Sequence, residues 1–162
     1  MASEKLLKEL NDHFNFELLS AYHYMAMAAY CSSENMNGFA HYFVEQAKEE
    51  YEHGMKFYQF INDMGGRVIP RAIEEPKNDY SSFLEVFKEA LDHEEQVTVK
   101  IYELLDLARE ENNYPTIQFL QWFVEEQLEE ENSMKDIIFV LEGIDGNFQG
   151  LYLLDKELGS RQ

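Results

Sequence analysis

The sequence is poor in cysteine and in basic residues, and each shortage excludes a class of protein. Its 162 residues include a single cysteine, Cys31, which excludes an intramolecular disulfide. Thirteen Lys and Arg stand against thirty-two Asp and Glu, a formal net charge of -19. Such a charge argues against a nucleic-acid backbone or an anionic membrane surface as a partner. Cations are the natural partners of this chain.

Long hydrophobic runs are also missing from the sequence. No apolar run approaches the roughly 18 residues of a membrane span, and there is no internal repeat or low-complexity stretch. Residues 1–5 lack the apolar run of a signal peptide. We therefore expect a soluble cytoplasmic protein. The length predicts a single domain over residues 1–162.

Polar, proline and glycine residues mark the joints between four long periodic segments and a short fifth one. The third segment opens with Ser82-Phe83-Leu84-Glu85, a capping-box pattern, and Pro115 lies at the start of the fourth. Apolar residues recur at helical spacing within each segment, which predicts five helices. The expected helices are residues 3–32, 38–64, 82–111, 113–143 and 148–158.

The lengths of the connections predict the topology. The first and third breaks are only a few residues long, so each should join an antiparallel helical hairpin. The second connection, 65–81, is extended by composition, and about 15 such residues at roughly 3.3 Å each reach about 50 Å. A helix of about 28 residues spans roughly 42 Å. We therefore expect an all-α four-helix bundle with a long crossover and a short fifth helix.

Polar residues interrupt the apolar stripe of each long helix near its midpoint. Steps of alternately three and four residues keep side chains on one helical face. At midpoint height, these stripes contain Glu17, Glu50, His53, Glu94, Gln127 and Glu130. Because all four helices contribute at the same height, these side chains should meet in one layer of the bundle.

The predicted layer gathers four carboxylates where hydrophobic residues belong. Four ionised carboxylates would cost several kcal/mol each in desolvation unless positive charge joins them, and two divalent cations balance them. Oxygen-rich ligands with an imidazole suit iron or manganese, and the lack of thiolates argues against a structural zinc site. The alternative is an inert polar layer whose members share protons and hydrogen bonds or turn to the surface.

The spacing of these residues matches most of a di-metal pattern. Di-iron carboxylate bundles use single glutamates from two helices and a Glu-x-x-His pair from each of the other two. Here Glu17 and Glu94 are the single glutamates, and Glu50 with His53 forms one pair. The fourth helix carries Glu130 without a histidine. We hypothesise that the missing imidazole leaves the second metal more weakly held, which suits a site that releases oxidised iron.

Over essentially the whole chain, these residues resemble the bacterial non-haem ferritins. The resemblance implies a ferritin-like four-helix bundle with a di-iron centre in each subunit. It implies that Glu17, Glu50 and His53 hold one iron. It also implies that Glu50, together with Glu94 and Glu130, holds the other.

The same resemblance implies roles for residues around the two irons. Gln127 would be a hydrogen-bonding neighbour, and Tyr24 an electron donor to oxygen, although packing in the core would also explain Tyr24. Trp122 lies close by, and packing is its better explanation. The family also has a third iron site on the inner side, and the residues that match it here are Glu49, Glu126, Glu129 and Glu130. For the first three of these, a solvated acidic face is the alternative explanation.

The family implies that Fe(II) is oxidised by O2 or H2O2 and stored as a ferric mineral inside a shell of 24 identical subunits. An aromatic content of 14% is compatible with subunit contacts, or with a thick core. The bacterioferritin branch is disfavoured, because Tyr51 stands where that branch has its haem-ligating methionine, and we expect no haem. Cys31 should be packed. Solvated or capping roles are expected for His13, His23, His41 and His93.

Two other functions stay open at this point. One is a di-iron oxygenase or peroxidase that keeps its metals, which would want a second histidine and a substrate cavity. The other is a metal-buffering or structural helical assembly with an inert polar layer. Oxidation of many ferrous ions per chain, with the ferric product retained, would separate storage from both.

Overall fold

The computed structural model describes residues 2–162, which form five α-helices and, within that range, no strand. Each helix boundary lies within one residue of the boundary expected from the sequence. Among the described residues, no helix combines the length and the apolar character needed to cross a membrane. The helices are α1 (Glu4–Ser33), α2 (Asn37–Asp63), α3 (Phe83–Glu110), α4 (Tyr114–Ile144) and α5 (Phe148–Leu158).

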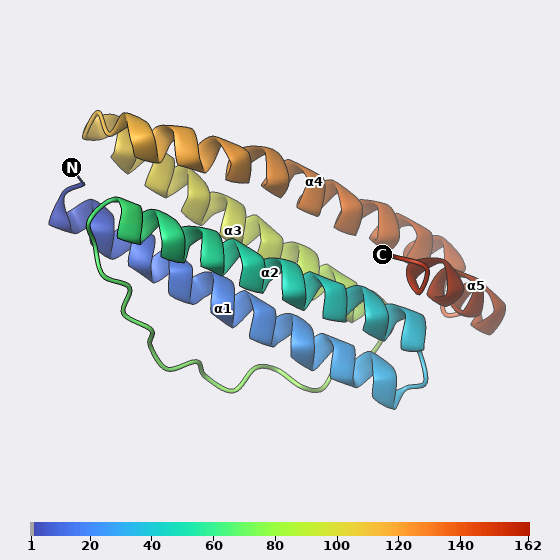
Figure 1. Ribbon diagram of the computed structural model, residues 1–162. Coiled ribbons are helices and arrows are strands. Elements are labelled where there is room, and N and C mark those ends of the chain that lie inside the picture. Colours follow the sequence, from blue (N-terminus) through green and yellow to red (C-terminus); the bar gives the residue numbers. More distant parts are fainter. Residues whose placement is uncertain (1) are drawn as a thin grey trace.

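The four long helices lie side by side, and α5 lies across one end of the bundle (Figure 1). Helices α1 and α2 form one antiparallel hairpin, and α3 and α4 form another. The crossover, residues 64–82, runs along the outside of the bundle from one end to the other and delivers α3 parallel to α2. The predicted bundle with its long crossover is confirmed.

Two asparagines of α1 hold the crossover against the bundle. The backbone N–H of Ile69 donates to Asn11 Oδ1 at 2.8 Å, and that of Arg71 donates to Asn15 Oδ1 at 2.8 Å. Both amide side chains also donate to the Ile69 carbonyl. An extended segment has no internal hydrogen bonds, so these side chains satisfy backbone groups that would otherwise depend on water. The crossover is therefore fixed to α1 without forming a helix.

Side-chain caps set the starts of four helices. Ser82 Oγ accepts a hydrogen bond from the Glu85 backbone N–H at 3.1 Å, as the predicted capping box requires. The reciprocal half differs from that motif, because the Glu85 carboxylate accepts from the N–H and hydroxyl of Ser81. The remaining side-chain caps are Ser3 for α1, Asn113 for α4 and Asn147 for α5.

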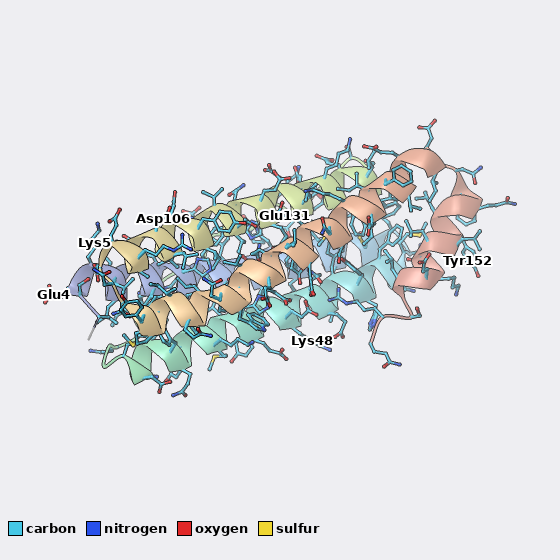
Figure 2. All side chains as sticks on the ribbon, turned by 90° about the horizontal axis from the view of Figure 1, so that it is seen from above. Glu4, Lys5, Lys48, Asp106, Glu131 and Tyr152 are labelled. Atoms are coloured by element: carbon cyan, nitrogen blue, oxygen red, sulfur yellow. The ribbon has the colours of Figure 1, made fainter. Side chains whose placement is uncertain are left out.

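Helix α2 takes its cap from α5. Met36, at its start, offers no side-chain cap, and the Phe39 N–H donates instead to Asp155 Oδ1 at 2.9 Å. A Cβ at Gly38 would lie 1.7 Å from the Asp155 carbonyl oxygen, so glycine is needed for this close approach. Figure 2 shows α5 across the end of the bundle, with Tyr152 pointing away from the long helices. These contacts fix α5 to the start of α2.

The apolar core consists of two clusters on either side of the polar midpoint. Phe43 and Phe87 pack with ring centroids 4.7 Å apart in the cluster nearer α5. Phe57 and Phe123 pack 4.8 Å apart in the other cluster. A fully buried side chain of this kind contributes about 1.5–3 kcal/mol. Burial of these two clusters therefore holds the four helices together on both sides of the polar layer, which itself contributes no apolar burial.

Candidate metal centre

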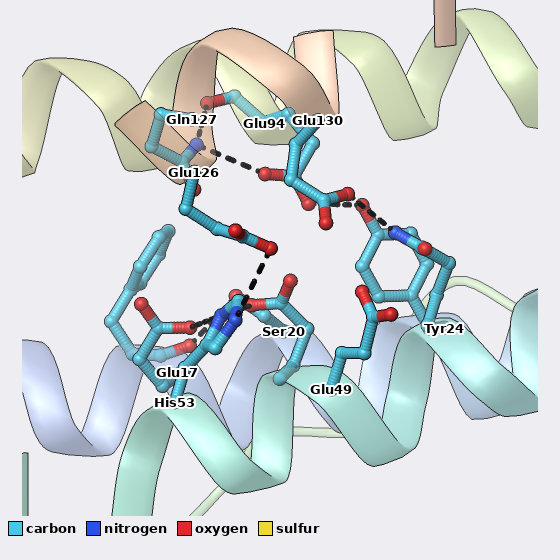
Figure 3. Close-up of polar contacts among 12 residues, drawn as sticks. Glu17, Ser20, Tyr24, Glu49, His53, Glu94, Glu126, Gln127 and Glu130 are labelled. Atoms are coloured by element: carbon cyan, nitrogen blue, oxygen red, sulfur yellow. Dashed lines mark hydrogen bonds and ion pairs between the residues drawn. The ribbon is translucent and has the colours of Figure 1, made fainter. Parts of the chain in front are cut away.

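Four glutamates and a histidine from four helices meet between the two apolar clusters. Figure 3 shows Glu17 and His53 on one side of a shared space and Glu94 and Glu130 on the other. Glu17 comes from α1, Glu50 and His53 from α2, Glu94 from α3 and Glu130 from α4. All five side chains are buried. The structure thus brings together the residues that the sequence proposes for two metals.

The first half of the centre consists of Glu17, Glu50 and His53. His53 Nδ1 lies 3.8 Å from Glu17 Oε2 and 3.6 Å from Glu50 Oε2. Donor atoms that share one metal at about 2.0–2.2 Å lie about 3 to 4 Å apart. Glu17 Oε2, both Glu50 oxygens and His53 Nδ1 are buried without a hydrogen-bond partner among the described residues. A buried polar atom without a partner costs about 1–3 kcal/mol, and a cation here would satisfy these atoms together.

The second half of the centre consists of Glu94 and Glu130, whose carboxylates already accept hydrogen bonds. The Tyr24 hydroxyl donates to Glu94 Oε1, and Gln127 Nε2 donates to Glu94 Oε2 at 3.0 Å. Gln46 Nε2 donates to Glu130 Oε2 at 2.8 Å. Hydrogen bonds from the protein therefore already orient these carboxylates.

Burial and mutual repulsion set the charges of the centre. Burial raises the pKa of Glu94 to about 7, and burial with the charge of Glu94 raises the pKa of Glu130 to about 9. Burial and the neighbouring carboxylates also raise the pKa of Glu50 well above its usual range. Burial acts in the same direction on Glu17, but its hydrogen bond with His13 and the proximity of His53 outweigh burial and hold the pKa of Glu17 well below its usual value. In the metal-free centre these shifts favour the protonated form of Glu50 and Glu130 and the carboxylate form of Glu17.

A third group of carboxylates lies beside the second half. Oxygens of Glu49, Glu126 and Glu130 lie within 4.8 Å of one another. The three residues line a cavity of about 430 Å³ between α2 and α4. Glu129, which the resemblance places in a third iron site, lines the same cavity but is exposed and does not join the group. Arg161 Nη2 lies 2.8 Å from Glu49 Oε1 and partly neutralises it.

Comparison with known proteins decides the family. The profile described as "Ferritin-like domain" matches residues 7–144. The chain belongs to the ferritin-like family. It is 48% identical over 161 residues to the bacterial non-heme ferritin of Staphylococcus aureus (strain USA300), covering 99% of this chain and 97% of that protein. The bacterial non-heme ferritin of Staphylococcus epidermidis is 47% identical over the same share of this chain.

Solved ferritin structures agree closely with this fold. An open pore ferritin from the hyperthermophilic archaeon Archaeoglobus fulgidus superposes with a TM-score of 0.99 and 42% sequence identity, covering 100% of both chains. A closed form of the Archaeoglobus fulgidus ferritin, engineered by site-directed mutagenesis, gives a TM-score of 0.98. The resemblance to the bacterial non-haem ferritins, stated on the glutamate and histidine motifs, is confirmed.

Two histidines of this ferritin-like chain were expected to have solvated or capping roles, and for both that prediction is wrong. His13 is 3% exposed, and its Nε2 lies 2.8 Å from Glu17 Oε1. His93 is 7% exposed, and its Nε2 lies 2.6 Å from Ser20 Oγ. Helix α1 packs against both α2 and α3, so its buried face is wider than the single stripe read from the sequence. The i, i+4 spacing of His13 and Glu17 was the available signal for their contact.

The other two histidines are half-buried. His41 Nε2 contacts the backbone carbonyl of Arg161, so His41 holds the end of the chain against α2 rather than facing water. The His23 ring lies 5.2 Å from the His93 ring, and burial lowers the pKa of His23. Neither His23 nor His41 belongs to the two groups of candidate metal ligands found among the described residues.

Two aromatic side chains of the ferritin-like bundle lie beside the centre. Tyr24 is fully buried and contacts the second half through Glu94. The Trp122 ring centroid lies 5.4 Å from that of His53, and Lys56 Nζ lies 3.2 Å from the Trp122 ring centroid. Tyr24 therefore touches a candidate ligand by hydrogen bonding, whereas Trp122 touches one by packing.

Proposed function

We propose that this ferritin-like chain is an iron-storage protein with ferroxidase activity. It binds two Fe(II) ions per chain, oxidises them with O2 or H2O2, and stores the ferric product as a mineral inside a shell of 24 subunits. Iron is the substrate and cargo of this reaction. The observation that carries the proposal is the set of buried donor atoms of Glu17, Glu50 and His53 that lack hydrogen-bond partners among the described residues.

Each half of the centre suits one ferrous ion. In the first half, Glu17 Oε2 and His53 Nδ1 are the terminal donors. Glu50 has two unpartnered oxygens, and the charges of Glu94, Glu17 and Glu130 all act on it, so we assign one of its oxygens to each ion. Glu94 and Glu130 complete the second half. Oxygen donors with one imidazole form a ligand set that suits iron.

The reaction balances with two ferrous ions per turnover. Two Fe(II) ions give up two electrons, which together with two protons convert O2 to H2O2, or convert H2O2 to two water molecules. Glu50 and Glu130 hold protons in the metal-free centre and release them when the ions bind. We assign to Tyr24, hydrogen-bonded to Glu94, the role of a one-electron donor to oxygen that can replace one Fe(II) ion in this balance, giving up its hydroxyl proton with the electron and becoming a tyrosyl radical.

The cavity beside the centre favours storage over the chemistry of an oxygenase. Its lining includes Glu49, Glu126, Glu129 and Glu130, and Glu130 also belongs to the second half of the centre. Pockets for organic substrates are lined mainly by apolar and aromatic side chains, whereas this one attracts cations. We assign a third iron site to Glu49, Glu126 and Glu130, through which oxidised iron leaves the centre.

Exposed apolar side chains support assembly into a shell. Phe139 is 78% exposed, Phe148 is 69% exposed and Leu153 is 68% exposed. Large apolar side chains on a surface mark contacts with other proteins when they form patches. Size exclusion of the full-length chain should give an assembly of about 24 subunits of 19.2 kDa. A monomer or dimer under all conditions would remove the storage cavity.

Stopped-flow oxidation of Fe(II) tests the activity directly. The wild-type chain should oxidise many ferrous ions and retain the product as soluble, protein-bound ferric iron. Glu17→Ala should lose the fast phase, and Glu52→Ala, whose side chain is exposed on α2, should keep it. Unchanged oxidation in Glu17→Ala would contradict the site. Turnover limited to two tightly retained metals would favour an oxygenase, and no oxidation would favour a structural assembly.

A further inference from the structure

His13 contacts the metal centre from outside its set of candidate ligands. It lies one helical turn before Glu17 on α1, and its side chain is almost fully buried. His13 Nε2 and Glu17 Oε1 are 2.8 Å apart. No metal is assigned to His13, because it does not belong to the group formed by Glu17, Glu50 and His53.

The contact fixes which nitrogen of His13 carries hydrogen. A glutamate that binds a metal does so as a carboxylate, and a carboxylate only accepts hydrogen bonds, so His13 Nε2–H is the donor to Glu17. His13 Nδ1 is buried without a hydrogen-bond partner among residues 2–162. The hydrogen bond from Nε2 to Glu17 is therefore the one polar contact that this ring makes among these residues.

The same contact gives the two Glu17 oxygens different surroundings. Oε1 is occupied by the bond from His13. Oε2 has no hydrogen-bond partner and lies 3.8 Å from His53 Nδ1. The oxygen that faces the first half of the centre is thus the one that His13 leaves free.

Packing holds the His13 ring in place. Its centroid lies 4.6 Å from the Phe57 ring of α2, which is fully buried, and 6.2 Å from the Phe16 ring. A ring held by a neighbouring helix cannot follow the carboxylate if Glu17 rotates. The hydrogen bond therefore ties the orientation of Glu17 to the packing of α1 on α2.

We propose that His13 is a positioning residue of the metal centre, which orients Glu17 so that Oε2 alone is offered to the first ion. This inference rests on the proposed function, in which Glu17 is a ligand. Mutation of a residue that hydrogen-bonds to a metal ligand lowers metal affinity about 10- to 100-fold. Without the bond, Glu17 is free to rotate, to bind through both oxygens or to turn away.

The test uses Co(II), whose visible absorption reports the number and geometry of its ligands without any oxidation step. The full-length His13→Leu variant keeps the bulk of the side chain and loses the donor. We expect its affinity for the first Co(II) ion to fall at least about tenfold, with an altered visible spectrum. His13→Gln places an amide nitrogen near the position of Nε2 and should restore both affinity and spectrum. The polar control His13→Asn is too short to reach Glu17 and should behave like His13→Leu.

The outcomes separate this inference from the proposed function. Wild-type affinity and spectrum in His13→Leu would overturn the positioning role, as would equal losses in His13→Gln and His13→Asn, which would indicate packing alone. If His13→Leu does not fold, the comparison of the Gln and Asn variants decides. Glu17→Ala is measured alongside them. If it binds the first Co(II) ion like the wild type, the proposed site itself is wrong, whereas its loss beside an unaffected His13→Leu contradicts only the role of His13.

Discussion

The two halves of the metal centre differ in what their donor atoms already contact. In the first half, both oxygens of Glu50 and Nδ1 of His53 have no hydrogen-bond partner among the described residues. In the second half, Glu94 accepts hydrogen bonds from Tyr24 and Gln127. An ion entering the first half satisfies atoms that lack a partner, whereas one entering the second half meets carboxylates that hydrogen bonds already stabilise. We therefore expect the first half to fill first and to hold its ion more tightly.

Both halves hold protons that an ion must displace. In the first half, the pKa of Glu17 is held well below its usual value and that of Glu50 is raised. Burial lowers the pKa of His53, but the nearby carboxylates, chiefly Glu17, outweigh it and raise this pKa. In the second half, burial raises the pKa of Glu94 to about 7 and that of Glu130 to about 9, and no carboxylate has a pKa as low as that of Glu17. The second half also lacks an imidazole, as the sequence predicts.

Glu50→Ala should have the largest effect, because Glu50 is the only side chain that we assign to both halves. We expect the initial rate of Fe(II) oxidation to fall at least about 100-fold, since loss of a ligand should exceed loss of a ligand's hydrogen-bonding partner. Stopped-flow absorbance measures the rate, and Glu52→Ala, exposed on the same helix, is the matched control. A Glu50→Ala rate within a few-fold of the wild type would contradict the shared role.

Raising the pH should strengthen binding of the second ion, more steeply below pH 7 than above it. A carboxyl whose pKa is raised holds its proton until the pH passes that pKa, so below it each displaced proton changes metal affinity about tenfold per pH unit. Between pH 5.5 and 7 the second ion displaces protons from Glu94 and Glu130, and between pH 7 and 9 mainly from Glu130. Zn(II) titration calorimetry at several pH values measures the slope for this ion, and a slope that does not fall as the pH passes 7 would contradict the assignment of both carboxyls to the second half.

Gln127→Leu should lower the affinity for the second ion by about tenfold and leave the affinity for the first ion unchanged. Gln127 Nε2 lies 3.0 Å from Glu94 Oε2 and 3.2 Å from Thr98 Oγ1, and its hydrogen bond lowers the pKa of Glu94. Without it the pKa of Glu94 rises further, and the carboxylate is less well oriented. Zn(II) calorimetry of this variant is compared with that of Gln121→Leu, whose side chain is exposed on α4. Equal weakening of both ions would argue against a role confined to the second half.

Tyr24→Phe should have the smallest effect on binding, a loss of about 3- to 5-fold for the second ion, as expected for one hydrogen bond. The Tyr24 hydroxyl contacts only the Glu94 side of the centre. Tyr22→Phe, at a position that is 43% exposed on the same helix, is the control. If Tyr24→Phe weakened the first ion as strongly as the second, the assignment of Tyr24 to the second half would be wrong.

Most of the fold follows from local sequence signals. Helical periodicity, capping residues and the extended composition of 65–81 predict the five helices and the long crossover. The cap of α2 could not be predicted in this way, because Asp155 and Phe39 are 116 residues apart in the sequence. The approach of α5 at Gly38 depends on the same long-range packing. Local patterns define the helices, whereas contacts between distant segments determine how α5 is attached.

The candidate site shows the same division. The stripes single out Glu17, Glu50 and Glu94 because a charged residue is conspicuous among buried hydrophobic ones. The stripe pattern did not identify His13, because His13 lies beside the stripe and its burial depends on how closely α1 packs against α2. Glu129 was expected in the third group, but its position on α4 leaves it exposed. A sequence pattern locates residues on a helical face, but the width of that face depends on the neighbouring helices.

The most direct test of the unequal halves is a pair of crystal structures of the full-length protein, soaked without oxygen in Fe(II) at one ion and at two ions per chain. At one ion per chain we expect density between Glu17 Oε2, Glu50 and His53 Nδ1, with Glu94 still bonded to Tyr24. The second ion should then appear between Glu50, Glu94 and Glu130. A first ion bound between Glu94 and Glu130, or at surface carboxylates with the buried centre unchanged, would contradict the account.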